Sequence, residues 1–401
     1  MTTISTTQMG ALKGEQITAL TTEGFASLAP EVVAVLSSTQ FGSLSTDQVA
    51  ALTTGQAASL TINQAMGITS SQTTVLTTAN LNKLTTASFA ALSTGVVASL
   101  SSTQAAALTT AQVVALTTTQ AAALTSTQSA GFSTSQTVAL EVADLSKFAT
   151  AALDALSLTA SASLTSTQIN SLTSAQVASL TTDQVVALVS GQVVNLGTLQ
   201  AAALTSTQVV ALDATDLAKM NTSAFASLTT SAMSRLDVTQ VNAVTTAQIA
   251  ALTTAQAATL GTDQAAALTG TQLAAVTTQD IAKLSTAAMA AIALASFPRL
   301  TSSQLNSLTT SQVVAMTTAQ IVELVTAQTA NLGSLQASAL TSTQVAAMEV
   351  TDLSKLNTSA FASLSTSVVG NLDASQMGKV FDIRVAQGPD AWRGKCEPAR
   401  G

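Results

Sequence analysis

The sequence predicts an all-α fold, a superhelical solenoid of short capped helices with one helix in each eight-residue repeat. Three observations predict it. An apolar residue returns at every eighth position from Ile4 to Val380, 48 times without exception. The residue that follows is usually of a type that begins helices. Acidic and basic residues occupy opposite ends of the repeat, as the helix dipole favours.

The repeat unit, called the octad here, is plain in "LTTAQVVALTTTQAAALTSTQ" at 108–128. Five residues after each Leu-type position comes a second apolar position, apolar in 42 of 47 cases and usually preceded by Gln. Eight residues are about 2.2 helical turns, so an unbroken helix would rotate its apolar stripe by roughly 80° per octad. The chain must therefore break once per octad.

The start of each helix is predicted at the residue after the Leu position, as at Thr109 and Thr117. Of 47 such residues, 36 are Ser, Thr, Asp or Asn, the preferred N-caps. The Gln three residues later completes a capping box. Pro30 falls on the first helical position, where proline is tolerated. Each octad is thus predicted to form a helix of about two turns that ends at the Leu position.

Charge supports the same helix ends. Before residue 381 there are 17 acidic residues, and 15 lie at the cap, just before the Gln position or at it. Eight of the nine basic residues lie just before the Leu position, in the predicted last turn. A β-solenoid is the alternative, since Thr and Val favour strands, but it gives no reason for this sorting. A two-turn helix is unstable alone, so the octads must stack around one apolar seam.

The chain is predicted to divide into an octad-repeat solenoid at 1–380 and a non-repeat tail at 381–401. A longer period also runs through it: a variant octad begins at Asn80, Asp144, Asp216, Asp280 and Asp352, at alternating spacings of eight and nine octads. Alternate copies are therefore seventeen octads apart, as are "NLGTLQ" at 195 and "NLGSLQ" at 331. This super-repeat indicates growth by block duplication. The tail, with Trp392 and Cys396, is interpreted either as a docking or secretion segment or as an end foreign to the array.

The variant octads supply the predicted site residues. In four of them Asp replaces Gln, in the weaker copy at Asn80 Asn does so, and in all five Lys follows three residues later. One interpretation is a local ion pair that also complements the helix dipole. Another is a contact ridge between neighbouring molecules, or an aspartate column that binds a cation, although calcium needs six or more clustered oxygens. The residues of the predicted contact ridge are Asp144, Lys147, Asp216, Lys219, Asp280, Lys283, Asp352 and Lys355.

Composition argues against several functions. The chain has no His or Tyr and one Cys, so no Ser-His-Asp triad and no ordinary zinc site can form. No catalytic residue, cofactor or metal is predicted, and the chain is predicted not to be an enzyme. A net charge of −7 disfavours nucleic acid. No apolar run is long enough for membrane insertion, and no N-terminal signal peptide is visible.

Two resemblances follow from these motifs. The segment "LTTDQVVALVSGQ" at 180–192 resembles the first helix of the DNA-binding repeats of TAL effectors over about ten residues, which implies a short helix and nothing more. Over 1–380 the octad pattern resembles the Thr/Ala/Gln-rich repeat regions of large bacterial surface and secreted proteins, of adhesin or surface-layer type. That resemblance implies a structural, extracellular role.

Three functions are therefore considered. The first is a structural surface or secreted protein that forms rods, filaments or layers by self-association. The second is a module that binds ice or polysaccharide through regular Thr arrays. The third is an intracellular scaffold for partner proteins, which the missing signal peptide favours and the few charged or aromatic residues disfavour.

Overall fold

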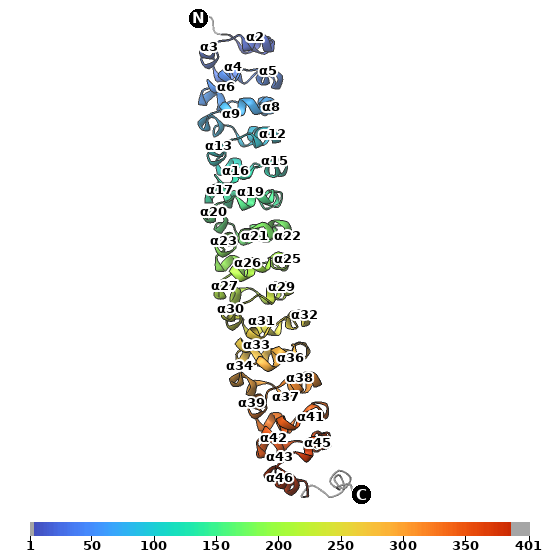
Figure 1. The fold of residues 1–401 in the computed structure, drawn as a ribbon. Helices are drawn as coiled ribbons and strands as arrows, with labels where there is room; N and C mark the ends of the chain where they lie inside the picture. Colours follow the sequence, from blue (N-terminus) through green and yellow to red (C-terminus); the bar gives the residue numbers. More distant parts are fainter. Residues whose placement is uncertain (1–3, 386–401) are drawn as a thin grey trace. The chain divides into compact units, whose positions relative to one another are not determined.

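The predicted all-α solenoid is confirmed by a computed structural model, which describes residues 4–385. Short helices follow one another at octad intervals, and none of the described residues forms a strand. The β-solenoid alternative is therefore wrong for this range. The chain divides into two compact units, residues 1–203 and 204–401, and in each unit the helices stack turn upon turn (Figure 1).

The helices of the first unit are α1 (Thr6–Ala11), α2 (Gly14–Thr18), α3 (Thr22–Ala26), α4 (Pro30–Val33), α5 (Ser38–Gly42), α6 (Thr46–Ala50), α7 (Thr54–Ala58), α8 (Ile62–Gly67), α9 (Ser70–Val75), α10 (Thr78–Leu81), α11 (Thr86–Ala90), α12 (Thr94–Ala98), α13 (Ser102–Ala106), α14 (Thr110–Val114), α15 (Thr118–Ala123), α16 (Ser126–Ser129), α17 (Thr134–Ala139), α18 (Val142–Leu145), α19 (Thr150–Asp154), α20 (Leu158–Ala162), α21 (Ser166–Ser171), α22 (Ser174–Ser179), α23 (Thr182–Val186), α24 (Ser190–Val194) and α25 (Thr198–Ala203).

Those of the second unit are α26 (Ser206–Ala211), α27 (Ala214–Lys219), α28 (Thr222–Ala226), α29 (Thr230–Met233), α30 (Val238–Ala243), α31 (Thr246–Ala250), α32 (Thr254–Ala257), α33 (Thr262–Ala267), α34 (Gly270–Ala275), α35 (Thr278–Ile281), α36 (Thr286–Ala291), the 3-10 helix η1 (Leu294–Arg299), α37 (Ser302–Ser307), α38 (Thr310–Ala315), α39 (Thr318–Val322), α40 (Thr326–Ala330), α41 (Ser334–Ala339), α42 (Ser342–Ala347), α43 (Val350–Lys355), α44 (Thr358–Ala362), α45 (Thr366–Gly370) and α46 (Ala374–Val385).

The octad folds locally as its caps predict. Before α14, Thr109 has an extended backbone, with φ −70° and ψ 153°, and its Oγ1 accepts the backbone N–H of Gln112 at 3.2 Å. In return, Gln112 Oε1 accepts the backbone N–H of Thr109 at 3.1 Å. This capping box satisfies two of the N–H groups that a helix start leaves open.

The helices are slightly shorter than the predicted two turns. All α-helices except α46 have four to six residues, because the Leu position itself is extended, as at Leu124 with φ −63° and ψ 133°. η1 departs from the α-helix where Pro298 lies inside it. α46 runs from Ala374 to Val385 and so continues past the last octad residue. The rest of the predicted tail, with Trp392 and Cys396, lies outside the described residues.

Helices pack against the helix three octads further along the chain. In the first unit α5 contacts α8, and in the second α27 contacts α30 and α33 contacts α36. Every Leu position from Leu36 to Leu364 is buried, with at most 8% of its surface exposed. The second apolar position faces the same interior: Phe25, Phe41 and Phe225 are fully buried. The core of each unit is therefore one continuous apolar seam inside the superhelix.

The Gln of the octad joins successive turns. Besides closing the capping box with Ser133, Gln136 directs its Nε2 at the preceding turn, where it donates to the carbonyl oxygens of Ala105 and Leu108, both at 2.9 Å. Gln272 does the same towards Val241 and Val244, at 2.8 and 2.7 Å. We call this series of buried Gln side chains the Gln ladder. Since helices pack three octads apart and the bonds reach back 28 to 31 residues, one turn takes between three and four octads.

Candidate functional site

The predicted site residues lie where the Gln ladder is interrupted. Five interruptions, called ladder gaps here, each cover three consecutive octads without Gln at the ladder position; a shorter interruption, at Gly24 and Val32, covers two. The sequence pattern identifies only the first residue of each gap, the Asn or Asp. The five ladder gaps are Asn80, Ser88 and Val96; Asp144, Ala152 and Ala160; Asp216, Ala224 and Ala232; Asp280, Ala288 and Ser296; and Asp352, Ala360 and Val368.

Large apolar side chains are buried directly after the middle position of several gaps. Phe89 follows Ser88, Phe225 follows Ala224, and Phe361 follows Ala360; their exposed fractions are 0, 0 and 2%. At ladder positions the next residue is usually Val, Ala or Ile. The gaps therefore exchange hydrogen bonds between turns for apolar packing.

Short polar side chains in the gaps still bind one of the two carbonyl oxygens that a ladder Gln would bind. Asn80 Nδ2 donates to the carbonyl oxygen of Leu52 at 2.7 Å, and Ser88 Oγ donates to that of Leu60 at 2.7 Å. Both acceptors lie 28 residues earlier, like the second acceptor of each Gln. An alanine in the same place has no donor, so the joint between turns loses its side-chain bonds there.

The aspartates at the gap starts point inward, not outward. Asp144, Asp280 and Asp352 are buried, with 2, 2 and 8% of their surface exposed. Asp280 Oδ2 accepts from Thr277 Oγ1 at 2.6 Å. Asp352 Oδ1 accepts from Thr326 Oγ1 at 2.8 Å.

Asp144 differs from these two. Its Oδ2 is buried and has no hydrogen-bond partner. The cap residue of its octad is Glu141, which brings no hydroxyl group. Burial raises the pKa of the Asp144 carboxyl from 3.8 to about 6, and the negative charge of Glu141 adds to the shift. Burial also raises the pKa of Asp154, which the hydrogen bond from Ser179 Oγ opposes.

The fourth aspartate, Asp216, is half-buried, and its backbone N–H donates to Asp213 Oδ1 at 2.7 Å. All four lysines of the predicted contact ridge are exposed: Lys147, Lys219, Lys283 and Lys355. The structure thus places the two halves of each Asp–Lys motif at different depths. The contact ridge stays a prediction, and its accessible part is the lysines. Among residues 4–385, no three acidic or sulfhydryl side chains gather as a metal site would require.

An asparagine clasp accompanies the super-repeat and was not predicted. Asn170 Nδ2 donates to the carbonyl oxygen of Asn195 at 2.6 Å, and Asn170 Oδ1 accepts the N–H of Gly197 at 2.7 Å. The same pair of bonds joins Asn306 to Asn331 and Gly333, at 2.8 and 2.7 Å. Steric crowding explains why glycine occupies this position, because a Cβ on Gly197 would lie 3.2 Å from Asn170 Oδ1 and 2.6 Å from Gln200 Oε1.

The signal for this clasp was present in the recurrence of "NLGTLQ" and "NLGSLQ". The partner asparagine, 25 residues upstream, could not be identified without the length of a superhelical turn.

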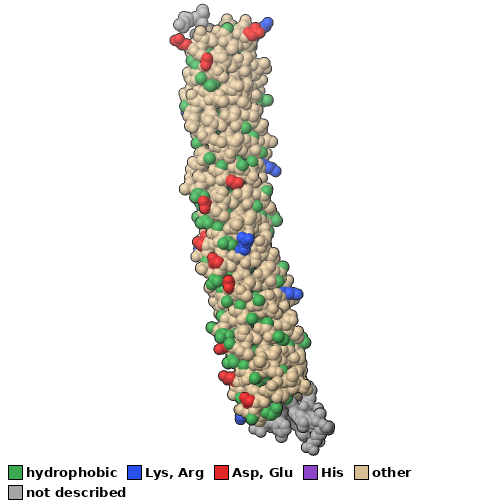
Figure 2. All heavy atoms as spheres, viewed as in Figure 1, with side chains coloured by type: hydrophobic (Ala, Val, Ile, Leu, Met, Phe, Trp, Pro, Cys, Tyr) green, Lys and Arg blue, Asp and Glu red, His purple; other side chains and the backbone are tan. Residues whose placement is uncertain are grey.

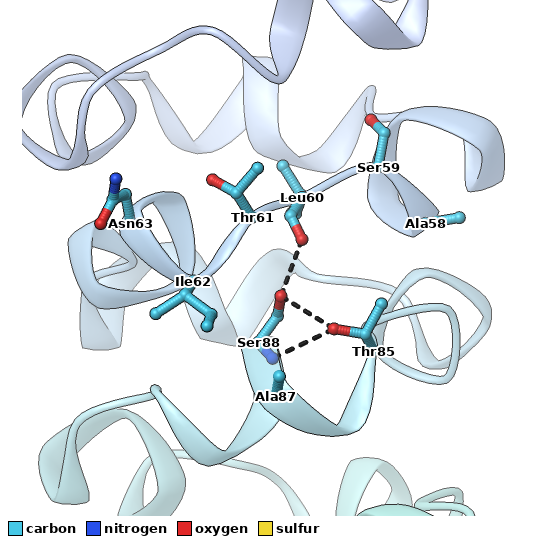
Figure 3. A pocket seen from close by; sticks show the side chains of 9 residues that line it. All are labelled: Ala58, Ser59, Leu60, Thr61, Ile62, Asn63, Thr85, Ala87 and Ser88. Carbon is cyan, nitrogen blue, oxygen red and sulfur yellow. Dashed lines mark hydrogen bonds between the residues drawn. The ribbon is translucent and has the colours of Figure 1, made fainter.

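A shallow hollow of about 600 Å³ lies beside the first ladder gap (Figure 3). Its lining joins the corner of residues 58–63 to Thr85, Ala87 and Ser88 of the next turn. Ser88 Oγ is already bonded to Leu60 and accepts from Thr85 Oγ1 at 3.0 Å. The lining is uncharged: hydroxyl groups, the Asn63 amide and the half-exposed side chain of Ile62.

The surface is neutral over most of its area. On the face drawn in Figure 2, charged side chains are few and lie scattered among uncharged ones. The most exposed large apolar side chains include Leu199 and Leu335, at 71 and 61%, and Val189 and Val325, at 55 and 42%. The members of each pair are seventeen octads apart, so the super-repeat repeats this exposure. No helix within residues 4–385 has the length and apolar character to cross a membrane.

Comparison with known proteins agrees with the repeat architecture. The family model of the ALTTAQ repeat matches residues 25–62, 81–118 and 162–190, all in the first unit. The letters of that description occur literally at 107–112 and 251–256, where they span the Leu position, the cap and the ladder Gln. No curated protein and no solved structure matches the chain. The chain is a helical repeat protein that is similar to the ALTTAQ repeat over these three stretches.

Proposed function

We propose that the protein is a non-enzymatic structural protein of the cell surface or of a secreted assembly, which forms rods, filaments or layers by association of its copies. The observation that carries this proposal is the Gln ladder. The same buried, uncharged joint recurs between turns in both units, so octads can be added in number without a new kind of contact. The repeated block of seventeen octads indicates that the chain has grown in this way.

Association with further copies is supported by the character of the surface. Few charges oppose contact between copies, and large apolar side chains are exposed at positions that the super-repeat duplicates. Leu199 and Leu335 are the most exposed of these pairs. Exposed apolar side chains that recur at a fixed spacing suit repeated contacts between parallel molecules.

Assembly of the purified chain tests the proposal. Sedimentation velocity and negative-stain electron microscopy over a concentration series are expected to show ordered fibres or sheets. The double variant Leu199→Thr, Leu335→Thr should weaken assembly. A matched control is Val35→Thr, Ile62→Thr, which also removes two exposed apolar side chains but at positions without an apolar copy seventeen octads further on. A chain that stays monomeric at every concentration would contradict the proposal.

Location is tested separately. Surface labelling and fractionation of cells that express the full-length gene product should recover the protein at the cell surface or in the medium. Recovery in the cytosol alone would favour the scaffold function instead.

A second candidate, binding of a neutral saccharide, is favoured by the hollow at the first ladder gap. Hydroxyl groups, an amide and an apolar side chain without charge are a lining that suits a neutral sugar. Isothermal titration with neutral oligosaccharides, compared between the wild type and Ile62→Asp, would test it. Ice binding has less support, because cap hydroxyl groups such as Thr109 Oγ1 already accept a backbone N–H; absence of thermal hysteresis would exclude it.

A further inference from the structure

The ladder position of Asp144 carries an inference that is independent of the proposed function. The nearest ladder glutamines on either side, Gln136 and Gln168, each place an N–H donor against carbonyl oxygens of the preceding turn. The same register, 28 residues back, sets Asp144 opposite the carbonyl oxygen of Leu116. An ionised carboxylate brings no donor to that place.

Asn80 shows that a side chain of this length reaches the target. Asparagine and aspartate have the same shape, and Asn80 Nδ2 lies 2.7 Å from the carbonyl oxygen of Leu52, 28 residues earlier. By the same register, we expect one carboxyl oxygen of Asp144 to lie opposite the carbonyl oxygen of Leu116, where Asn80 presents an N–H group to Leu52. Two buried oxygens at that separation repel each other unless a proton lies between them.

Few charges lie near enough to compensate. The helices packed against α18 are α15 and α21, and neither contains an ionisable residue. The charged groups along the chain on either side are Glu141, Lys147 and Asp154. Lys147 is exposed, whereas Glu141 raises the cost of a second negative charge. Asp280 and Asp352 each accept a hydroxyl hydrogen, but Asp144 Oδ2 has no such partner.

We propose that Asp144 is a proton-operated joint between two turns of the solenoid. With its proton, the carboxyl donates to the carbonyl oxygen of Leu116 and replaces the missing Gln bond. When the proton leaves to solvent, the bond is lost, and two oxygens face each other inside the ladder gap. The joint between these turns is tight in acid and loosened at neutral pH.

The direction of the pH effect follows from proton linkage. The folded chain holds the proton up to a pKa of about 6, whereas the unfolded chain releases it near 3.8. Between these values the folded state binds more protons, so stability falls as pH rises and is constant above the window. Two pH units are a factor of about a hundred in the unfolding equilibrium constant.

Carbon-13 NMR of the full chain labelled at Asp carboxyl carbons tests the protonation. One resonance is expected to titrate near 6 and to be absent from the Asp144→Asn variant. Burial raises the pKa of Asp154 as well, so the resonance of Asp154 should remain in the variant and serve as an internal control. Titration of every aspartate near its ordinary value would overturn the proposal.

Denaturant unfolding and local amide exchange at pH 4 and pH 7 test the consequence. The unfolding equilibrium constant of this segment should rise about a hundredfold in the wild type as pH increases, whereas in Asp144→Asn, which has a permanent donor, it should rise much less. Asp280→Asn is the matched control and should keep the wild-type pH dependence. If calcium stabilises the wild type at pH 7 and Asp144→Asn abolishes that effect, a cation and not a proton fills the joint, and the proposal is wrong.

Discussion

Replacing Gln136 by alanine removes one complete joint of the Gln ladder. The side chain, 2% exposed, takes part in four hydrogen bonds: Oε1 accepts from the Ser133 N–H and from Ser133 Oγ, and Nε2 donates to the carbonyl oxygens of Ala105 and Leu108. Each such bond contributes about 1 kcal/mol net, and each buried group left without a partner costs about 1–3 kcal/mol. We expect Gln136→Ala to lower the local unfolding free energy by about 3–5 kcal/mol.

The matched control is Gln8→Ala. Gln8 is exposed and closes the same capping box, with Ser5 N to Gln8 Oε1 at 2.9 Å, and the described residues, 4–385, include none of the carbonyl groups 28 to 31 positions before it. Its replacement should cost only about 0.5–1 kcal/mol. Guanidine unfolding followed by circular dichroism, with amide exchange to locate the effect, measures both. A difference of less than about 1 kcal/mol between the two variants would refute the idea that the amide nitrogen joins the turns.

Other consequences of the structure are open to simple tests. Thr109→Val keeps the shape of the cap but loses its acceptor, so unfolding should become easier by about 1 kcal/mol, whereas Thr110→Val, at an exposed first helical position, should have little effect in the same guanidine experiment. Gly67→Ala should destabilise strongly, by about 2 kcal/mol or more, because a Cβ there would lie 2.1 Å from the Ser38 carbonyl oxygen. In Gly191→Ala the added Cβ would have no atom within 4 Å, so the variant should stabilise helix α24 by about 0.5–1 kcal/mol. The melting temperatures of the two glycine variants test both expectations. Raising NaCl from low to molar concentration should change the melting temperature little, since the joints are uncharged, and a large drop would show that ion pairs hold the turns.

The local half of the architecture could be predicted from the sequence. Thr109 and Gln112 indicate a helix start because capping is a relation between residues close in the chain. The same reasoning correctly put Pro30 at a first helical position, where α4 begins. The separation of acidic from basic residues also indicates which part of each octad begins the helix and which part ends it.

The half that depends on the superhelical turn could not be predicted. The sequence of its own octad identifies Gln136 only as a capping residue. Nothing in that octad shows that Leu108, 28 residues earlier, lies beside the Gln136 side chain. For the same reason the sequence presents Asp144 as part of an exposed Asp–Lys motif. The structure instead buries the Asp144 side chain, with 2% of its surface exposed. The role of Asn170 could not be found because its partner is 25 residues away.

We expect the ladder gaps to resist force less than the stretches where the Gln ladder is continuous. Where the Gln ladder is continuous, hydrogen bonds and apolar packing both hold a turn to the next, and hydrogen bonds break abruptly over a short extension. In a ladder gap, packing around residues such as Phe225 and Phe361 does most of that work and yields over a longer distance. A chain under tension would therefore open first at these segments, absorb work there, and leave the intervening stretches intact. Spacings of eight and nine octads would distribute such yielding points along the sequence.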